Sequence, residues 1–148
     1  DGAYYFENIP FIKPQLANPN DTYWQQQAAL MNLINIPPSW PAIGTATTKV
    51  AVIDCGINLN YQDLNLISPG FQYDQSSRSN GARPDPVVGS PDHGTGVTSL
   101  MVAKKDNLLG IAGVAPGFPV LPLSVIHGSD VELAAALNEC VKQNVRVI

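Results

Sequence analysis

Charged residues are scarce in this 148-residue sequence: they make up 14% of it, and the eight lysines and arginines are scattered. With a net charge of −4 the chain has no basic patch of the kind that binds nucleic acid, so we expect no nucleic-acid partner. No apolar run reaches the roughly 18 residues that a membrane span needs. The first residues lack the basic and apolar regions of a signal peptide, as a processed secreted protein also would. The 45% of hydrophobic residues instead predict one globular domain with a hydrophobic core.

Cysteine and histidine are also scarce. The two cysteines, Cys55 and Cys140, match no metal-ligand spacing, and we expect two separate buried thiols, although one disulfide between them is compatible with the sequence. The two histidines, His93 and His127, belong to no His-Glu-x-x-His pattern, which argues against a zinc enzyme. No Gly-x-Gly-x-x-Gly pattern or P-loop follows an expected strand, which argues against a nucleotide-binding domain.

Prolines and a short apolar run organise the N-terminal part. Residues 1–18 contain Pro10 and Pro14 and predict an extended arm, because each proline disfavours helix at its own position and at the one before it. Residues 21–33 favour a short helix with Asp21 as its cap. Residues 49–54 form a short apolar run from Val50 to Ile53 that is rich in β-branched residues, and its continuous pattern predicts a buried strand in a parallel sheet covered on both faces.

The rest of the chain alternates expected strands and helices. Ser129 and Glu132 match a capping box at the start of a helix that runs to residue 142. The other expected elements are a strand at 70–73, a long polar loop at 75–92, a helix at 94–103, a turn-rich segment at 104–119, a strand at 120–126 and a strand at 145–148. Pro122 suggests that the strand at 120–126 is an edge strand or that the proline lies at the start of the strand. This alternation predicts an α/β fold with a doubly wound, mostly parallel sheet. Because the last strand stops without a turn residue, we expect a domain that is incomplete in this chain.

Two short motifs carry candidate chemistry. Asp54 ends the strand at 49–54, and open α/β sheets place their working groups at the carboxyl ends of strands. His93 begins a helix, and an Asp can hold a His in the required tautomer and stabilise the imidazolium that forms when the His takes a proton. Each residue also has a simpler interpretation, Asp54 as a loop cap and His93 as a helix cap or a solvated side chain. His127 is interpreted as solvated.

These motifs, at 50–57 and 92–97, resemble the aspartate motif and the His-Gly-Thr motif of the subtilisin-like serine proteases. The resemblance extends over residues 19–148, in order and without large gaps. It includes Asn20 to Trp40, Asp63-Leu64, Asn107, Gly110-Ile111, Gly113 to Pro116 and Val145 to Ile148. By this resemblance, residues 19–148 are the N-terminal half of a subtilisin-like catalytic domain, and residues 1–18 are an extended arm or the junction with a propeptide.

The resemblance implies an Asp-His-Ser triad in which Asp54 and His93 take the places of the catalytic Asp and His. The family carries its serine in a Gly-Thr-Ser-x-Ala stretch on a later helix. That serine, and the Asn that helps to hold the oxyanion, would lie beyond Ile148, in a C-terminal segment or a separate chain. None of the serines present has the setting of a nucleophile, so we expect this chain to be inactive by itself.

A structural calcium site is also implied. In the family it would draw on the side chains of Asp63 and Asn107 and on carbonyls of the loop at 105–111, and oxygen-only ligands suit calcium. An Asp cap followed by an ordinary turn is the simpler interpretation. Cys55 stands where the family most often has Thr or Ser, and we expect it to be a small buried group.

As a whole the resemblance implies a secreted or cell-envelope serine endopeptidase that acts on polypeptides, with an inhibitory propeptide as a further partner and no catalytic cofactor. A protease-like domain without a serine, serving as a binding or scaffolding module, is the alternative from another functional class. An α/β nucleotide-binding domain is a third interpretation, against which the missing glycine motifs count.

Overall fold

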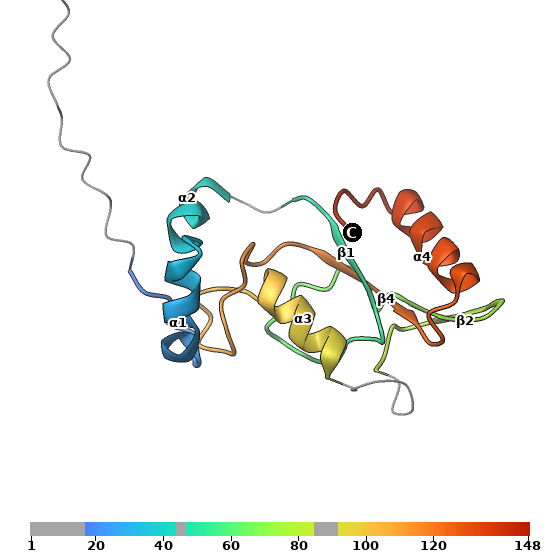
Figure 1. Cartoon of the computed structure of the whole chain (residues 1–148), viewed down its shortest axis with the longest axis horizontal. Coiled ribbons are helices and arrows are strands. Elements are labelled where there is room, and N and C mark those ends of the chain that lie inside the picture. Colours follow the sequence, from blue (N-terminus) through green and yellow to red (C-terminus); the bar gives the residue numbers. More distant parts are fainter. Residues whose placement is uncertain (1–16, 44–46, 85–91) are drawn as a thin grey trace, which may run out of the picture.

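The computed structural model describes residues 17–43, 47–84 and 92–148. Within them a sheet of four strands, in the order β1-β4-β2-β3, is flanked by helices (Figure 1). β1 (Val50–Asp54), β4 (Val120–Val125) and β2 (Phe71–Asp74) run parallel, and β3 (Ser77–Asn80) is antiparallel to β2. The predicted α/β class with a mostly parallel sheet is confirmed.

Two helices cover opposite faces of the sheet, because neighbouring strand residues point to opposite sides. Ala51 packs in a cluster with Cys140 of α4 (Asp130–Lys142), whereas Val52 packs in a cluster with Val102 of α3 (His93–Val102). β1 is therefore buried on both faces, which explains its continuous apolar pattern.

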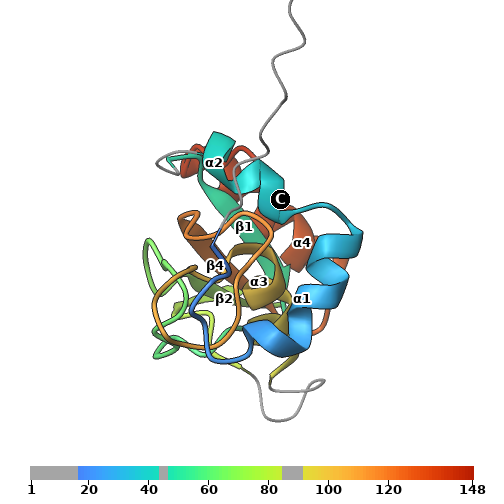
Figure 2. The ribbon, with the colours of Figure 1, turned by 90° about the vertical axis from the view of Figure 1, so that its left-hand side faces the viewer.

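The N-terminal helices form a further layer at the end of the molecule that faces the viewer in Figure 2. This layer consists of α1 (Trp24–Leu33), a 3₁₀ turn (Pro37–Ser39) and α2 (Trp40–Ile43). The rings of Trp24 and Trp40 lie with their centroids 5.8 Å apart and pack with Ala112 from the loop after α3. The layer is thereby attached to the segment that follows α3. None of the helices in the described ranges has the length and apolarity to cross a lipid bilayer.

The expected polar loop at 75–92 is partly wrong, because Ser77–Asn80 forms β3 and closes a hairpin with β2. All four residues of β3 are exposed, so the strand has no apolar pattern from which the sequence could have predicted it. Tertiary contacts stabilise it instead: the Arg78 guanidinium lies 4.2 Å from the centroid of the Phe71 ring and 3.0 Å from a carboxylate oxygen of Glu139 on α4. Residues 85–91 of the expected loop lie outside the described residues.

Of the two positions expected for Pro122, the edge strand is wrong, because β4 lies between β1 and β2; Pro122 is instead the third residue of β4, near its start. Val120 directs its N–H to Asn65 and its C=O to Ile67, on the side of the sheet where β2 lies. Pro122 has the same orientation two residues later, and the ladder between β2 and β4 begins only at Phe71 paired with Leu123. Pro122 has no N–H to donate, but it lies before the first paired residue of the β2–β4 ladder, so no ladder hydrogen bond is lost. A proline is therefore tolerated in this central strand.

Two smaller expectations need correction. Asp21 does not cap α1: the N-cap is Tyr23, which makes no side-chain cap hydrogen bond, and the Asp21 carboxylate instead accepts the backbone N–H of Asp106 at 3.0 Å. The strand expected at 145–148 is reduced to one parallel bridge, between Val147 and Val50.

Glu132 of α4 connects its helix to the turn after β2 and to the loop between β4 and α4. It is fully buried, and its carboxylate accepts backbone N–H groups from Gln75, His127 and Ser129 at 2.7, 2.9 and 3.3 Å. The Ser129 side chain accepts the N–H of Glu132 in return, which confirms the predicted capping box. Burial by itself would raise the pKa of Glu132, but the three N–H donors outweigh it and lower this pKa below its usual value.

We expect Glu132→Gln to lower the free energy of unfolding by about 2–3 kcal/mol at pH 7, because an amide NH₂ would face buried N–H donors. The folded-state pKa of Glu132 is depressed, so its contribution is complete above the unfolded-state pKa of about 4.3 and fades as the pH falls through the folded-state value. Urea unfolding at pH 7 and pH 3 should therefore show a smaller difference between the two proteins at pH 3.

Asp130→Asn is the matched control, because Asp130 is an exposed acid in the same helical turn. We expect it to change stability by only about 0.5 kcal/mol. An equal effect of both substitutions would contradict the structural role given to Glu132.

Candidate active site

The candidate site forms where the end of β1 meets the beginning of α3. Asp54 is the last residue of β1 and His93 is the first residue of α3. The backbones come so close that a Cβ atom on Gly94 would lie 2.2 Å from the carbonyl oxygen of Gly56. Gly56 itself has φ +108°, and a Cβ there would lie 2.1 Å from the carbonyl oxygen of Arg83. Only glycine fits both positions, and the two glycines bring the side chains of Asp54 and His93 together.

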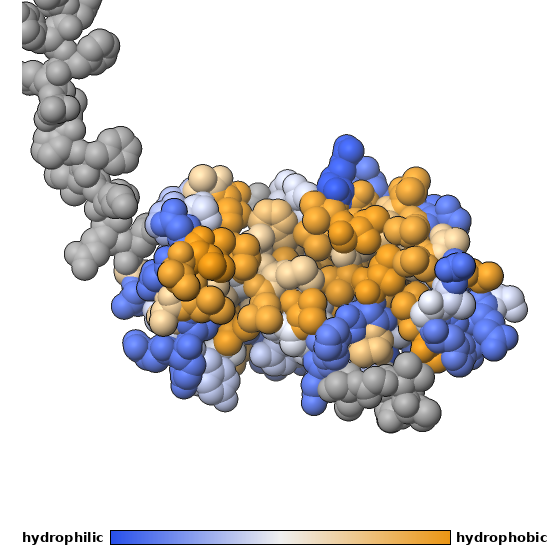
Figure 3. Space-filling view, viewed as in Figure 1, coloured by the Kyte–Doolittle hydropathy of each residue, from blue (hydrophilic) through white to orange (hydrophobic). Residues whose placement is uncertain are grey.

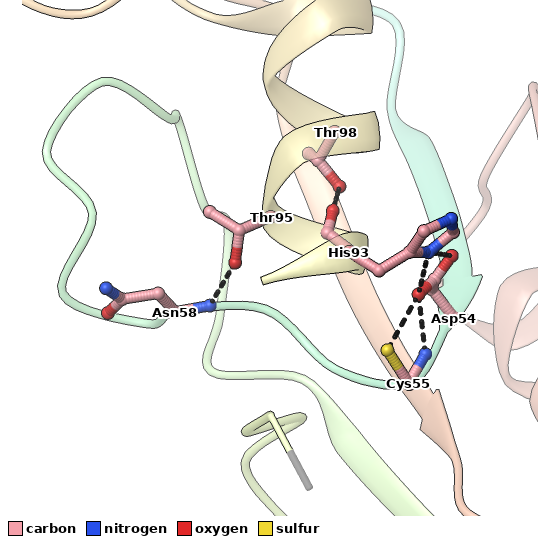
Figure 4. Close-up of polar contacts among 7 residues, drawn as sticks. Asp54, Cys55, Asn58, His93, Thr95 and Thr98 are labelled. Carbon is pink, nitrogen blue, oxygen red and sulfur yellow. Dashed lines mark hydrogen bonds and ion pairs between the residues drawn. The ribbon is translucent and has the colours of Figure 1, made fainter. Parts of the chain in front are cut away.

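The side chains of Asp54 and His93 point toward one another in Figure 4. Nδ1 of His93 lies 3.0 and 3.1 Å from the two carboxylate oxygens of Asp54. A carboxylate in this place favours the tautomer in which Nδ1 carries the proton, and Nε2 then has a lone pair to accept one. The His93 side chain is 60% exposed and that of Asp54 is 17% exposed. The pair can therefore act as a base toward a group that reaches it from solvent.

Oδ1 of Asp54 accepts two further hydrogen bonds from the next residue (Figure 4). The backbone N–H of Cys55 lies 2.7 Å from it and the thiol sulfur 3.1 Å from it. Burial by itself would raise the pKa of Asp54, but the hydrogen bonds from His93 and from both groups of Cys55 outweigh it and lower this pKa. Asp54 is therefore a carboxylate at neutral pH.

The thiol of Cys55 is no substitute for a nucleophilic serine. It donates to Asp54, on the Nδ1 side of the imidazole, whereas the basic nitrogen would be Nε2. Burial, followed by the hydrogen bond to Asp54, raises the pKa of Cys55, so the group stays protonated at neutral pH. Cys140 is buried on the inner face of α4, whereas Cys55 is only partly buried, so the expected burial holds for Cys140 alone; no disulfide joins the two cysteines.

A second link fixes α3 against the loop after β1. Oγ1 of Thr95, two residues after the histidine, accepts the backbone N–H of Asn58 at 2.9 Å (Figure 4). Thr98 is fully buried, and its hydroxyl donates to the carbonyl oxygen of Gly94 at 2.6 Å. The Thr98 bond lies within the helix, whereas the Thr95 bond joins the helix to the loop and so limits its rotation, and with it the position of the imidazole.

The residues expected to hold calcium also come together. Nδ2 of Asn107 donates to Oδ1 of Asp63 at 2.8 Å, and the backbone N–H of Ile111 donates to Oδ2 at 3.3 Å. Asp63 is 1% exposed. Burial is the main cause that raises its pKa, and repulsion from Asp21 adds to it. Asp63 is thus a buried acid that faces the loop at 105–111.

Asp21 is the member of this group that sequence reasoning missed. It is 5% exposed, and its Oδ1 is buried with no hydrogen-bond donor among the described residues. No signal in the sequence indicated this, because an acid just before a helix predicts a cap, and only the contact with Asp106 shows that Asp21 faces the loop after α3.

Comparison with known proteins decides the family. The Subtilase family profile matches residues 45–148. The chain belongs to the subtilase family. The subtilase match includes both Asp54 and His93, and also Asp63 after β1 and Asn107 after α3.

Known proteases align with most of the chain. An extracellular protease of Xanthomonas campestris pv. campestris is 32% identical over 133 residues, which cover 73% of this chain and 23% of that protein. The major intracellular serine protease of Bacillus subtilis is 30% identical over 125 residues, which cover 80% of this chain and 38% of that protein. The chain therefore spans only about a quarter to two fifths of these relatives.

A solved protease structure from Pseudoalteromonas arctica shares the fold. It superposes with a TM-score of 0.65 and 24% sequence identity, over 83% of this chain and 43% of that one. This likeness independently supports the subtilisin-like arrangement of the sheet and helices.

His127, interpreted from the sequence as a solvated side chain, is exposed but makes two hydrogen bonds. Its Nε2 lies 3.1 Å from Oδ1 of Asp74 and its backbone N–H donates to Glu132. It belongs to the loop between β4 and α4, and its hydrogen bonds go to Asp74 and Glu132.

The contact between Gly94 and Gly56 gives a direct test of the geometry. We expect Gly94→Ala to destabilise the protein by about 1–3 kcal/mol, because the added methyl group would meet the Gly56 carbonyl and Asp54 Oδ1. Gly96→Ala is the matched control on the same helix, since a Cβ at Gly96 would have no atom within 4 Å. Alanine there should stabilise the helix by up to about 1 kcal/mol. Urea unfolding of both variants measures the difference, and equal effects would contradict the close approach.

Proposed function

We propose that this subtilase chain supplies the Asp and His of an Asp-His-Ser triad in a serine endopeptidase, and that a C-terminal segment or a separate chain supplies the serine. The observation that carries the proposal is the hydrogen bond between Nδ1 of His93 and Asp54, which leaves Nε2 on an exposed imidazole. Family membership supports the reaction class, and the substrate is a polypeptide.

In this mechanism the serine attacks the scissile carbonyl while Nε2 of His93 takes its proton. Asp54 keeps the ring oriented and stabilises the imidazolium, which its lowered pKa favours because the carboxylate stays charged. His93 then gives the proton to the leaving amine, and water repeats the sequence to release the acyl group. An Asn and backbone N–H groups from the serine-bearing part would hold the oxyanion.

The surface of the chain supports a further protein segment in this place. Apolar side chains form a broad band across the face shown in Figure 3. Large apolar residues are exposed on α3, on α4 and at the end of the chain: Leu100 is 58% exposed, Val131 63%, Val141 79% and Ile148 63%. The outer edge of β1 is paired only through the bridge to Val147 among the described residues. An apolar face next to an open parallel strand edge is the surface that a continued sheet and its helices would cover.

A fluorophosphonate probe tests the triad in the whole protein as purified from its source. We expect the label on a serine outside this chain, and loss of labelling in His93→Ala and Asp54→Ala. In subtilisin, the reference enzyme of this family, removing the Asp costs about 3 × 10⁴ in turnover and removing the His about 2 × 10⁶, and we expect losses of that order.

His127→Ala is the matched control, because His127 is an exposed histidine paired with Asp74 rather than with Asp54. It should label like the unmodified protein. If no serine is labelled, or if labelling persists without His93, the enzyme proposal fails and a serine-less binding or scaffolding module takes its place.

We also propose a structural calcium ion held by Asp63, Asn107 and Asp21. Two buried carboxylates face one loop, and one oxygen of Asp21 has no donor in the described ranges. Calcium takes about six to eight oxygen ligands and suits acids, amide oxygens and loop carbonyls of this kind. The positive charges nearby are engaged elsewhere, since Lys104 donates to the Gln62 carbonyl.

Thermal unfolding with calcium and with a chelator tests this ion. At a calcium concentration about 100 times the dissociation constant we expect a gain of about 2.7 kcal/mol, or about 5–10 °C in Tm. Asp63→Asn and Asp21→Asn should abolish the dependence, whereas Asp130→Asn, at the other end of the molecule, should keep it. An equal Tm with calcium and with chelator would contradict the proposal.

A secreted or cell-envelope location and an inhibitory propeptide partner remain part of the proposal. One relative is named extracellular and another intracellular, so the location is a question for the whole protein. Residues 1–16, where the propeptide junction would fall, lie outside the described residues.

A further inference from the structure

Three different metal-ligating atoms converge at the carboxyl end of β1. The Cys55 sulfur and Nδ1 of His93 lie 3.1 and 3.0 Å from Oδ1 of Asp54, and one ligand atom from each residue lies within 4.8 Å of the others. Thiolate, imidazole and carboxylate are the three ligand types that zinc accepts in proteins. A serine or threonine at position 55 would give Asp54 a similar hydrogen bond but a much poorer zinc ligand.

The spacing suits a small tetrahedral ion. Zinc binds sulfur at about 2.3 Å and nitrogen or oxygen at about 2.0–2.2 Å, so tetrahedral ligand atoms lie roughly 3.3–3.7 Å apart. The present separations of about 3.0 to at most 4.8 Å bracket that range, and side-chain rotations are enough to reach it. The imidazole is 60% exposed, so an ion from solution can reach the group.

We propose that Asp54, Cys55 and His93 form a binding site for a thiophilic divalent cation such as Zn²⁺, with water as its fourth ligand. On binding, the thiol proton passes to solvent and the sulfur binds as thiolate. The lone pair of Nδ1 goes to the metal, and the single proton of the neutral ring then resides on Nε2. No redox change occurs.

The bound ion would prevent His93 from acting as a base. A ring protonated at Nε2 cannot take a proton from a nucleophile, and Asp54 bound to the metal no longer accepts from Nδ1. This consequence rests on the proposed function, whereas the metal site rests only on the three side chains. Zinc binding and catalysis would therefore exclude one another.

Cobalt titration of the reduced protein tests the site without any activity measurement. Co²⁺ occupies zinc sites, and a thiolate ligand adds a sulfur-to-cobalt charge-transfer band in the near ultraviolet. We expect this band in the unmodified protein, intense visible bands typical of tetrahedral geometry, and loss of both when Zn²⁺ is added. The proposed calcium site contains no sulfur and cannot produce the charge-transfer band.

Cys55→Ser should abolish the charge-transfer band and weaken Zn²⁺ binding by at least about 100-fold, since even an outer-shell partner is worth about 10–100-fold. Cys140→Ser is the matched control and should keep the band, because Cys140 is buried away from the site. His93→Asn should lose the tetrahedral bands and weaken binding. Circular dichroism establishes that each variant is folded.

Absence of the charge-transfer band in the unmodified protein, or its persistence in Cys55→Ser, would overturn the metal site. If the whole protein labels with the fluorophosphonate probe equally well at saturating Zn²⁺, the competition with catalysis would be overturned while the binding site stands. If no labelling occurs at all, the proposed function fails, and the cobalt result still decides the metal site.

Discussion

The position of the imidazole depends on a backbone-to-backbone contact. Gly94, next to His93, lies against the carbonyl of Gly56, two residues after Asp54, and neither position has room for a Cβ atom. The hydrogen bond between Asp54 and His93 is the result of this approach, and the Thr95 contact to Asn58 keeps the helix at that distance. The chemistry of the pair thus depends on two residues that have no side chain.

A single oxygen, Oδ1 of Asp54, receives the donors that define the site. The imidazole, the thiol of Cys55 and the Cys55 amide all point to it. Together they outweigh the cost of burying the carboxylate and keep it charged, which a residue that steadies an imidazolium requires. The same convergence places a sulfur, a nitrogen and an oxygen around one point, so an arrangement that orients a base also suits a soft cation.

Local patterns predicted the parts of the fold whose causes are local. The continuous apolar run of β1 and the capping box of α4 were both visible in the sequence and are present in the structure. Asp54 and His93 could be singled out by motif, although their distance could not. The features that were missed depend on distant partners: β3 is held by contacts of Arg78 to Phe71 and Glu139, and Asp21 turns from α1 to the loop after α3. Pro122 was misplaced because its effect depends on where the neighbouring ladder begins.

Several contacts in the structure join segments that are far apart in the sequence and are therefore synthesised at different times. Asp21 accepts the N–H of a residue 85 positions later, and every residue of β1 pairs with β4, on the far side of α3 in the sequence. During translation the apolar β1 therefore emerges before either neighbour exists and presents two open edges. The nascent chain must avoid wrong strand pairing until β4 has been synthesised, a demand that a chaperone or an assisting segment would relieve.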